Sequence, residues 1–163
     1  MDVKESQVII ALAFGQGVNK TPGKSNEALA KIVEKLCEKE RPPLCLQWEV
    51  ADCLPGLVKS HDLVVRRHRE KDKYLDTYEV LAQAKAYCDR LGIERAIIVA
   101  HPDHAPRCAA VAAKLGLGVQ IADTAGVPYD PDSVQEWTRN RDFFINEYES
   151  KAMEYYRRLG YID

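Results

Sequence analysis

The feature that most constrains the fold is an unbroken apolar run, Ala96 to Ala100, that changes abruptly into the polar stretch His101 to Arg107. The run has the length and the β-branched content of a strand buried on both faces. An alanine-rich segment at helical spacing, Cys108 to Leu115, follows the polar stretch. In an open α/β sheet, ligands bind outside the carboxyl ends of the strands, at junctions of this kind. The junction therefore predicts where a ligand would bind.

Further apolar segments alternate with segments at helical spacing along the rest of the chain. The expected strands span residues 8–14, 44–50, 62–66, 96–100 and 119–122. This alternation predicts a three-layer α/β/α Rossmann-like fold, with a mostly parallel sheet of about five strands and right-handed crossovers. The length of 163 residues fits a single α/β domain, residues 1–163.

Capping residues predict where the helices begin. Ser25 is expected to cap the first helix, and Asp76 with Glu79 has the spacing of a capping box. The segment Ser133 to Glu136 has the same spacing and predicts the start of the last helix, with a break around Thr138 to Asp142. The aromatic residues of that last helix follow helical spacing, so Trp137, Tyr148, Tyr155 and Tyr156 are expected to pack rather than to stack on bases.

Composition and charge narrow the class of protein. A formal net charge of −2 argues against nucleic acid or an anionic membrane as the partner. No run approaches the roughly twenty apolar residues of a membrane span. Residues 1–7 carry charges of both signs and lead into a strand, which predicts no secretory signal. The five cysteines form an odd set with no close-spaced pair, which indicates reduced thiols and a cytoplasmic location.

The ends of neighbouring parallel strands meet at one rim of the sheet, and this rim is the predicted site. Arg107 lies in the first turn of its helix, where unpaired N–H groups and a guanidinium both favour an anion. His104 is the candidate catalytic residue, as a proton donor or acceptor near neutral pH. The residues expected to bind a ligand there are Gly15, Gly17, Lys24, Glu70, Thr77, His101 and Arg107.

Simpler or different interpretations of the polar stretch remain open. The prolines can merely shape a connector while His104 caps a helix. His101 and His104, with Asp103, also suggest metal ligands, but their spacing within a proline-containing loop is not a helix face, and we predict no metal site. Cys108 can be a nucleophile beside His104, although a cysteine on an alanine-rich helix is more often buried.

The segment Gly17 to Ser25 follows a strand, precedes a helix and ends in Gly-Lys-Ser like a phosphate-binding P-loop. Its spacing differs, because five residues separate Gly17 from Gly23 where the phosphate cradle needs four. Pro22 also removes a backbone donor. A nucleotide hydrolase that uses Lys24 is therefore an alternative, and a plain contact between Lys24 and phosphate at the cleft is favoured over it.

Four segments together resemble the YdcF-like family: Val8 to Gly17, Asp76 to Glu79, Ile97 to Arg107 with His104 and Arg107 as its His-x-x-Arg, and Glu147 to Gly160. The resemblance implies a Rossmann-like α/β/α fold with a pocket at the strand ends, and no settled reaction. The chain departs from the family at Trp48-Glu49-Val50, where a Ser-Gly-Gly turn is usual.

These observations predict a small-molecule-binding protein whose ligand is anionic or nucleotide-like, with a nucleotide or S-adenosylmethionine as candidate. As an enzyme, it would be a transferase or hydrolase in which Arg107 binds the anion and His104 handles a proton. A non-catalytic ligand-sensing module would use the same pocket. The oligomeric state is not indicated.

Overall fold

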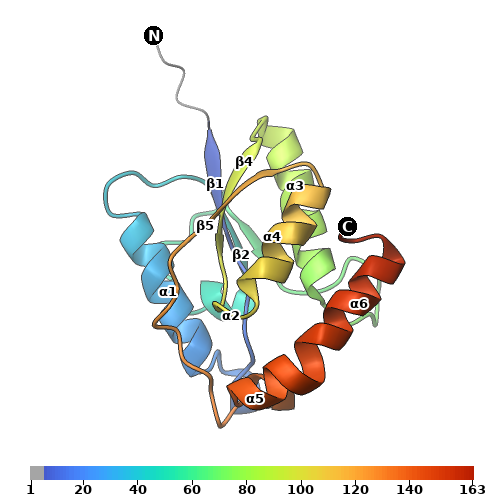
Figure 1. The fold of residues 1–163 in the computed structure, drawn as a ribbon. Helices are drawn as coiled ribbons and strands as arrows, with labels where there is room; N and C mark the ends of the chain where they lie inside the picture. The colour runs from blue at the N-terminus through green and yellow to red at the C-terminus, as the bar shows by residue number, and fades with distance from the viewer. Residues whose placement is uncertain (1–5) are drawn as a thin grey trace.

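A five-stranded, all-parallel sheet lies at the centre of the computed structural model, which describes residues 6–163 (Figure 1). The strands are β1 (Gln7–Ala11), β2 (Leu44–Gln47), β3 (Leu63–Val65), β4 (Arg95–Val99) and β5 (Gly118–Ile121), in the order β3-β2-β1-β4-β5. Residues 1–5, on which part of the prediction about a secretory signal rests, lie outside the described residues.

The two central strands are apolar on both faces, which explains why they sit in the middle of the sheet. β1 pairs with β4 along its whole length, from Gln7 opposite Arg95 to Ala11 opposite Val99. From β1 the chain builds the sheet first through β2 and β3 on one side, and then through β4 and β5 on the other. The loops after β1 and β4 therefore diverge and leave a crevice at the carboxyl edge, where ligands bind in folds of this kind.

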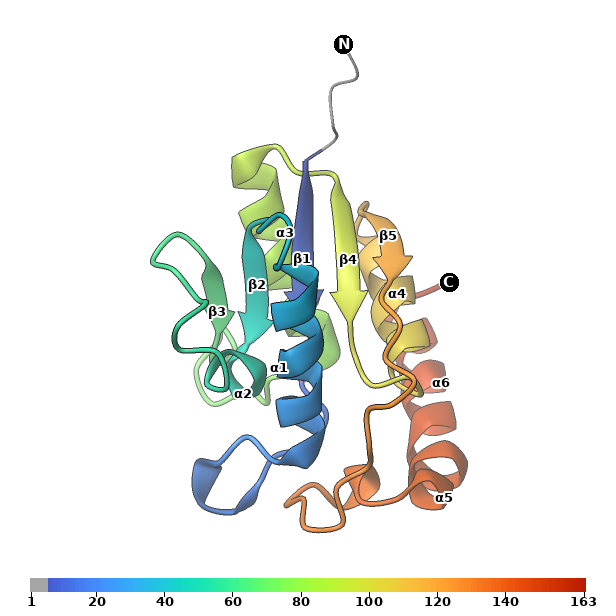
Figure 2. The same ribbon diagram turned by 90° about the vertical axis from the view of Figure 1, so that its left-hand side faces the viewer.

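Helices cover both faces of the sheet, as the alternating burial of strand residues requires. Figure 2 shows α1 (Lys24–Leu36) in front of the sheet and α3 (Thr77–Leu91) and α4 (Ala105–Lys114) behind it. Ile9 and Ala11 pack on the α1 side, whereas Val8 and Ile10 pack on the α3 and α4 side. The predicted three-layer α/β/α architecture is therefore confirmed.

The last quarter of the chain, after β5, crosses the carboxyl edge of the sheet. After a connector and the short turn η2 (Glu136–Thr138), the chain stays helical through α5 (Arg141–Phe143), a π-helical stretch η3 (Phe144–Glu149) and α6 (Ser150–Leu159). Phe144 packs into the core on the α1 side, and Tyr156 packs into the core on the α3 side. This segment, with α5 at the bottom of Figure 1 and α6 at the lower right, therefore covers part of the carboxyl edge of the sheet.

The capping predictions are partly wrong. α1 begins at Lys24 after Gly23, and the hydroxyl of Ser25 donates to the carbonyl of Pro128 instead of capping the helix. Ser133 does not cap a helix either, since its Oγ accepts from the backbone N–H groups of Gln16 and Gln135. The expected break before the last helix is present, and Asn140 supplies the cap there.

Asp76 caps α3 as predicted, because its carboxylate accepts from the backbone N–H of Glu79 at 2.8 Å. The side chain of Glu79 does not reach back to complete a capping box. It pairs instead with Arg69, with 2.8 Å between Oε1 and Nε, and this pairing holds the pKa of Glu79 at about 2 despite the burial of its carboxylate. Glu79 therefore ties the loop before α3 to that helix.

Within residues 6–163, none of the helices combines the length and the apolar character needed to cross a membrane.

Candidate functional site

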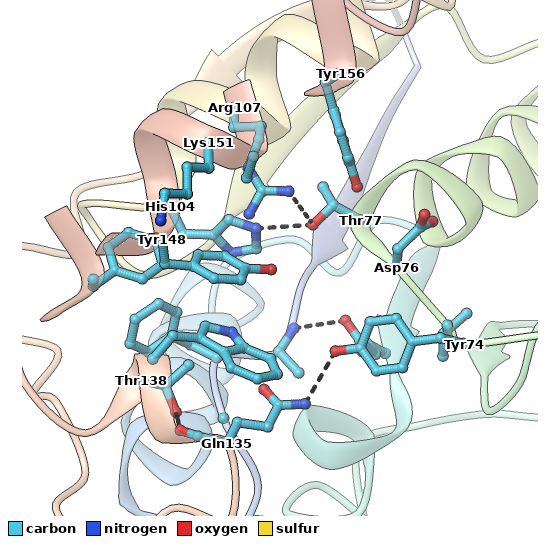
Figure 3. A pocket seen from close by; sticks show the side chains of 18 of the residues that line it. Tyr74, Asp76, Thr77, His104, Arg107, Gln135, Thr138, Tyr148, Lys151 and Tyr156 are labelled. Atoms are coloured by element: carbon cyan, nitrogen blue, oxygen red, sulfur yellow. Dashed lines mark hydrogen bonds between the residues drawn. The ribbon is translucent and has the colours of Figure 1, made fainter. Parts of the chain in front are cut away.

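A cavity of about 390 Å³ opens at the carboxyl edge of the sheet. Its walls come from the loop after β1, the short helix α2 (Trp48–Ala51), the start of α3, the start of α4 and residues 135–156. Figure 3 shows Tyr148 and Lys151 on one side of it, with Tyr74 and Asp76 on the other. The cavity therefore lies at the crevice that the strand order creates.

Four of the predicted site residues line this cavity together: Gly15, Thr77, His104 and Arg107. Thr77 is the first residue of α3, and its Oγ1 lies 2.9 Å from Nε2 of His104. The same hydroxyl oxygen accepts a hydrogen bond from Nη1 of Arg107 at 3.2 Å. The three polar side chains thus form one hydrogen-bonded group that joins the starts of α3 and α4.

Arg107 has a second and closer partner, Glu149. The guanidinium donates from Nε to Oε1 at 2.6 Å and from Nη2 to Oε2 at 3.4 Å. The two side chains are only 4% and 13% exposed. Burial opposes the charge of Arg107, but the carboxylate of Glu149 outweighs this and raises the pKa of Arg107. Much of the guanidinium's charge is therefore balanced within the protein, whereas the sequence suggests that it is available to an anion.

The first turn of α4 also offers fewer free donors than its sequence suggests. The backbone N–H of Ala105 donates to the carbonyl of His101 at 2.8 Å, and Pro106 has no N–H group. An anion at this helix terminus would therefore meet a smaller set of backbone donors than the full first turn that the prediction assumed.

His104 is buried and neutral. Burial lowers its pKa well below the ordinary value, and the nearby charge of Arg107 lowers it further. Nε2 is bonded to Thr77, but the buried Nδ1 has no hydrogen-bond partner among the described residues. A neutral imidazole can accept a proton from a hydroxyl group, so the geometry is compatible with the predicted role in proton transfer.

Gly17 and Lys24 do not line the cavity. The backbone N–H of Gly17 donates to the carbonyl of Thr21 at 2.9 Å, which closes a local turn. The side chain of Lys24 is exposed at the start of α1, and its backbone N–H donates to Asp130. Neither the phosphate contact predicted for Lys24 nor a P-loop that uses it is located at this cavity.

Glu70 and His101 also lie away from the cavity lining. Glu70 is exposed and forms an ion pair with Lys73. His101 is buried behind the cavity wall, where its ring stacks on Phe14 with 4.0 Å between the centroids and an angle of 16°. Its Nδ1 accepts from the backbone N–H of Asp103 at 3.2 Å. His101 therefore supports the wall rather than forming its surface.

An aromatic wall is the largest feature that the sequence analysis did not assign to the site. Trp137 and Tyr148 stack with 4.9 Å between ring centroids and an angle of 6°, and Phe144 packs on Tyr148 at 5.6 Å. All three rings line the cavity, as do Tyr155 and Tyr156. Helical spacing correctly indicates an apolar face, but it does not tell what lies opposite that face.

Glu49 is a further cavity residue that the sequence analysis did not assign to the site. The predicted strand 44–50 actually ends at Gln47, and the chain turns at once into α2. Glu49 is 5% exposed, and its Oε2 has no hydrogen-bond partner among the described residues. Burial raises the pKa of this carboxyl group to about 7. The sequence signal that could have assigned Glu49 to the site is the Trp48-Glu49 pair, which directly follows a buried strand.

Acidic side chains outnumber free basic ones around the cavity. Glu49, Asp76 and Glu147 line the cavity. The basic residues that line it are Lys151 and Arg107, and Arg107 is already paired with Glu149. Within residues 6–163, no group of three or more histidine, cysteine, aspartate or glutamate side chains is placed to hold a metal ion.

Comparison of the chain with protein-family models, with curated proteins and with solved structures gives no match. The resemblance to the YdcF-like family therefore stays a prediction from the residues that carry it.

Proposed function

We propose that this protein binds a small, nucleotide-like molecule in the cavity at the carboxyl edge of the sheet, with the planar ring of the ligand against the aromatic wall. The observation that carries the proposal is the combination of Trp137 and Tyr148 with the Thr77–His104–Arg107 group in one cavity. Small-molecule sites have this make-up, in which mostly apolar and aromatic walls surround a few placed polar groups.

The volume of the cavity supports a ligand of this size. About 390 Å³ lies in the lower part of the range of roughly 300–1,000 Å³ that is usual for small-molecule sites. Aromatic side chains offer flat faces on which planar rings can stack, whatever substituents those rings carry. A single ring system with one polar arm therefore fits better than a long chain.

The charges favour a ligand with little negative charge. Arg107 is paired with Glu149. The cavity lining contains Lys151 together with the carboxylates of Glu49, Asp76 and Glu147. One anionic group near Arg107 is compatible with these surroundings, but a polyphosphate would meet repulsion. A mononucleotide and S-adenosylmethionine remain the candidate ligands.

A second candidate function is group transfer or hydrolysis at the same site, and the contact between Thr77 and His104 favours it. The neutral imidazole would accept the proton of a hydroxyl group, on Thr77 or on the ligand, as that oxygen forms a bond to the electrophilic centre of the group that is transferred. The bond from that centre to the leaving group then breaks, and the imidazolium gives the proton to the leaving group. No carboxylate bonds to Nδ1 of His104 within the described residues, so this differs from a serine-hydrolase triad.

The test is a ligand screen read by the melting temperature and by the fluorescence of the two tryptophans. Adenosine, AMP, S-adenosylmethionine and a sugar phosphate make up the panel. At least one of the nucleoside compounds is expected to raise the melting temperature. The variant Tyr148→Leu is expected to weaken its binding at least tenfold, whereas Tyr161→Leu, outside the cavity lining, leaves the affinity within twofold. No binding by any member of the panel would refute the proposal.

The variant His104→Gln then distinguishes an enzyme from a ligand sensor. Loss of turnover with retained affinity indicates catalysis, and a ligand recovered unchanged from the wild-type protein indicates sensing. The free state of all five cysteines, each within the described residues, supports the proposal that the protein works in a reducing compartment such as the cytoplasm.

A further inference from the structure

The cavity holds a hydrogen-bond acceptor that none of the interactions described above uses. Oε2 of Glu49 is buried and has no hydrogen-bond partner among residues 6–163. A buried oxygen left without a partner destabilises the fold. Because most buried polar groups in native proteins are satisfied, an exception on a cavity wall indicates that a ligand supplies the missing donor.

We propose that Glu49 determines which ligands the cavity accepts, by taking a hydrogen bond from an N–H group at the edge of the planar ring. The ligand class is then an amino-substituted heteroaromatic ring. This inference rests on the proposed function, since it assumes that the cavity binds a ring.

The position of Glu49 follows from how β2 ends. The side-chain oxygen of Gln47 accepts from the backbone N–H of Ala13 at 2.9 Å, which fixes the end of β2 beside the loop after β1. α2 begins at the next residue, so Glu49 lies at the same edge of the sheet as Thr77 and His104. These elements pack against α1 and the core on the other side, and the side chain of Glu49 is buried between that core and the cavity.

The surroundings of Glu49 favour a donor over an acceptor. The cavity lining also contains Asp76 and Glu147, and the guanidinium of Arg107 is already bonded to Glu149. Above about pH 7, where the Glu49 carboxyl group is ionised, a ligand that presents only acceptors would leave this carboxylate unpaired and would add repulsion. An amino group, or a ring nitrogen that carries a proton, supplies both the hydrogen bond and favourable charge.

The probes that test this are 2-aminopyridine and 2-methylpyridine, which have the same shape and differ in an amino group and a methyl group. Binding is followed by NMR, through the chemical shifts of Glu49, Thr77 and Tyr148. At pH 8, where both pyridines are mostly neutral and Glu49 is largely ionised, 2-aminopyridine is expected to bind the wild-type protein at least tenfold more tightly than 2-methylpyridine. In Glu49→Met, which removes the acceptor and keeps the length of the side chain, the ratio should fall below twofold.

Two further variants keep the test decisive. Glu49→Gln retains one acceptor oxygen, so an intermediate ratio is expected, and it replaces Glu49→Met if that variant fails to fold. Glu34→Gln removes an exposed carboxylate from α1, outside the cavity lining, and should leave the tenfold preference unchanged.

The outcomes separate this inference from the proposed function. Equal binding of the two pyridines by the wild-type protein, or an unchanged ratio in the Glu49 variants, refutes the role of Glu49 while nucleoside binding still supports the proposed function. If the nucleosides bind and neither pyridine shifts the cavity residues, the inference alone is refuted. If neither the nucleosides nor the pyridines bind, both are refuted.

Discussion

The hydroxyl oxygen of Thr77 lies 2.9 Å from Nε2 of His104 and accepts a hydrogen bond from Nη1 of Arg107 at 3.2 Å. One small side chain therefore links residues that are 27 and 30 positions away in the sequence. Because Thr77 is the first residue of α3, this contact fixes the start of α3 against the start of α4. The same oxygen faces the cavity, so the contact serves both the fold and the site.

Replacing Thr77 by valine preserves the shape of the side chain and removes both hydrogen bonds. The variant leaves Nε2 of His104 without its partner and removes the hydrogen bond from Nη1 of Arg107 to Thr77, which should lower the free energy of unfolding by about 1–3 kcal/mol. Thr77→Ser keeps the hydroxyl group and should lose less than about 1 kcal/mol. Urea denaturation measures both values, and equal stability of the two variants would contradict the importance of the hydroxyl group.

The buried pair of Arg107 and Glu149 predicts a larger effect. Arg107→Met leaves the carboxylate of Glu149 buried without its partner, so a loss of about 3–5 kcal/mol is expected. The double variant Arg107→Met with Glu149→Met should recover much of this loss, because it buries no unpaired charge.

A matched control for this pair is present on the same helix. Lys114 forms an exposed ion pair with Asp163 at 2.5 Å, and Lys114→Met should cost less than about 1 kcal/mol. If Arg107→Met lowers the free energy of unfolding in urea denaturation no more than Lys114→Met does, the ion pair between Arg107 and Glu149 does not stabilise the fold as predicted.

The architecture could be predicted because its central strands are buried on both faces. β1 and β4 therefore need unbroken apolar runs, and such runs can be recognised in the sequence without knowing which strands lie beside them. The end of β2 could not be predicted in the same way. Leu44 to Val50 remains mostly apolar beyond the true end at Gln47, since Val50 belongs to the core from within a helix.

The site was predictable where its residues directly follow a strand or cap a helix, as His104, Arg107 and Thr77 do. Glu149 was not, because the ion pair joins residues 42 positions apart and nothing in the spacing specifies such a contact. The roles of Trp137 and Tyr148 were also hidden. Helical spacing predicts that they are partly buried, but only the path of residues 135–156 across the sheet edge shows that they face a cavity.

The cap at Asp76 predicts a modest, specific effect. Asp76→Ala removes the acceptor for the backbone N–H of Glu79, which should lower the free energy of unfolding by about 1 kcal/mol. Asp76→Asn keeps an oxygen that can cap the helix and should lose only a few tenths of a kcal/mol. Thermal and urea denaturation of the two variants give the comparison. A loss in the asparagine variant as large as that in the alanine variant would indicate that the charge of Asp76 matters more than its hydrogen bond to the backbone.

Gly15 is required by both its backbone conformation and its neighbours. Its φ is +77°, and a Cβ placed there would lie 2.7 Å from the hydroxyl oxygens of Ser133 and Thr138. Gly15→Ala should therefore destabilise the fold by about 2 kcal/mol or more and distort the cavity rim. Gly126→Ala is the control, since no atom lies within 4 Å of its Cβ position. Similar melting temperatures for the two variants would contradict this packing.

The raised pKa of Glu49 predicts how stability depends on pH. Burial raises this pKa from an ordinary value of 4.5 to about 7, so the folded state holds a proton that the unfolded state releases between these values. The stabilisation is complete below pH 4.5 and is lost as the pH rises through 7, by an amount on the order of 3 kcal/mol at most.

Glu49→Gln carries no titrating group at this position, and its stability relative to the wild-type protein should therefore increase as the pH rises from 5 to about 8. Urea denaturation of both proteins at each pH gives this difference, in which the contributions of other titrating groups largely cancel. Glu147→Gln, with Glu49 intact, should follow the wild-type curve closely over this range. A constant difference between Glu49→Gln and the wild-type protein would mean that Glu49 is ionised throughout, and that its surroundings in the cavity stabilise the carboxylate rather than the acid.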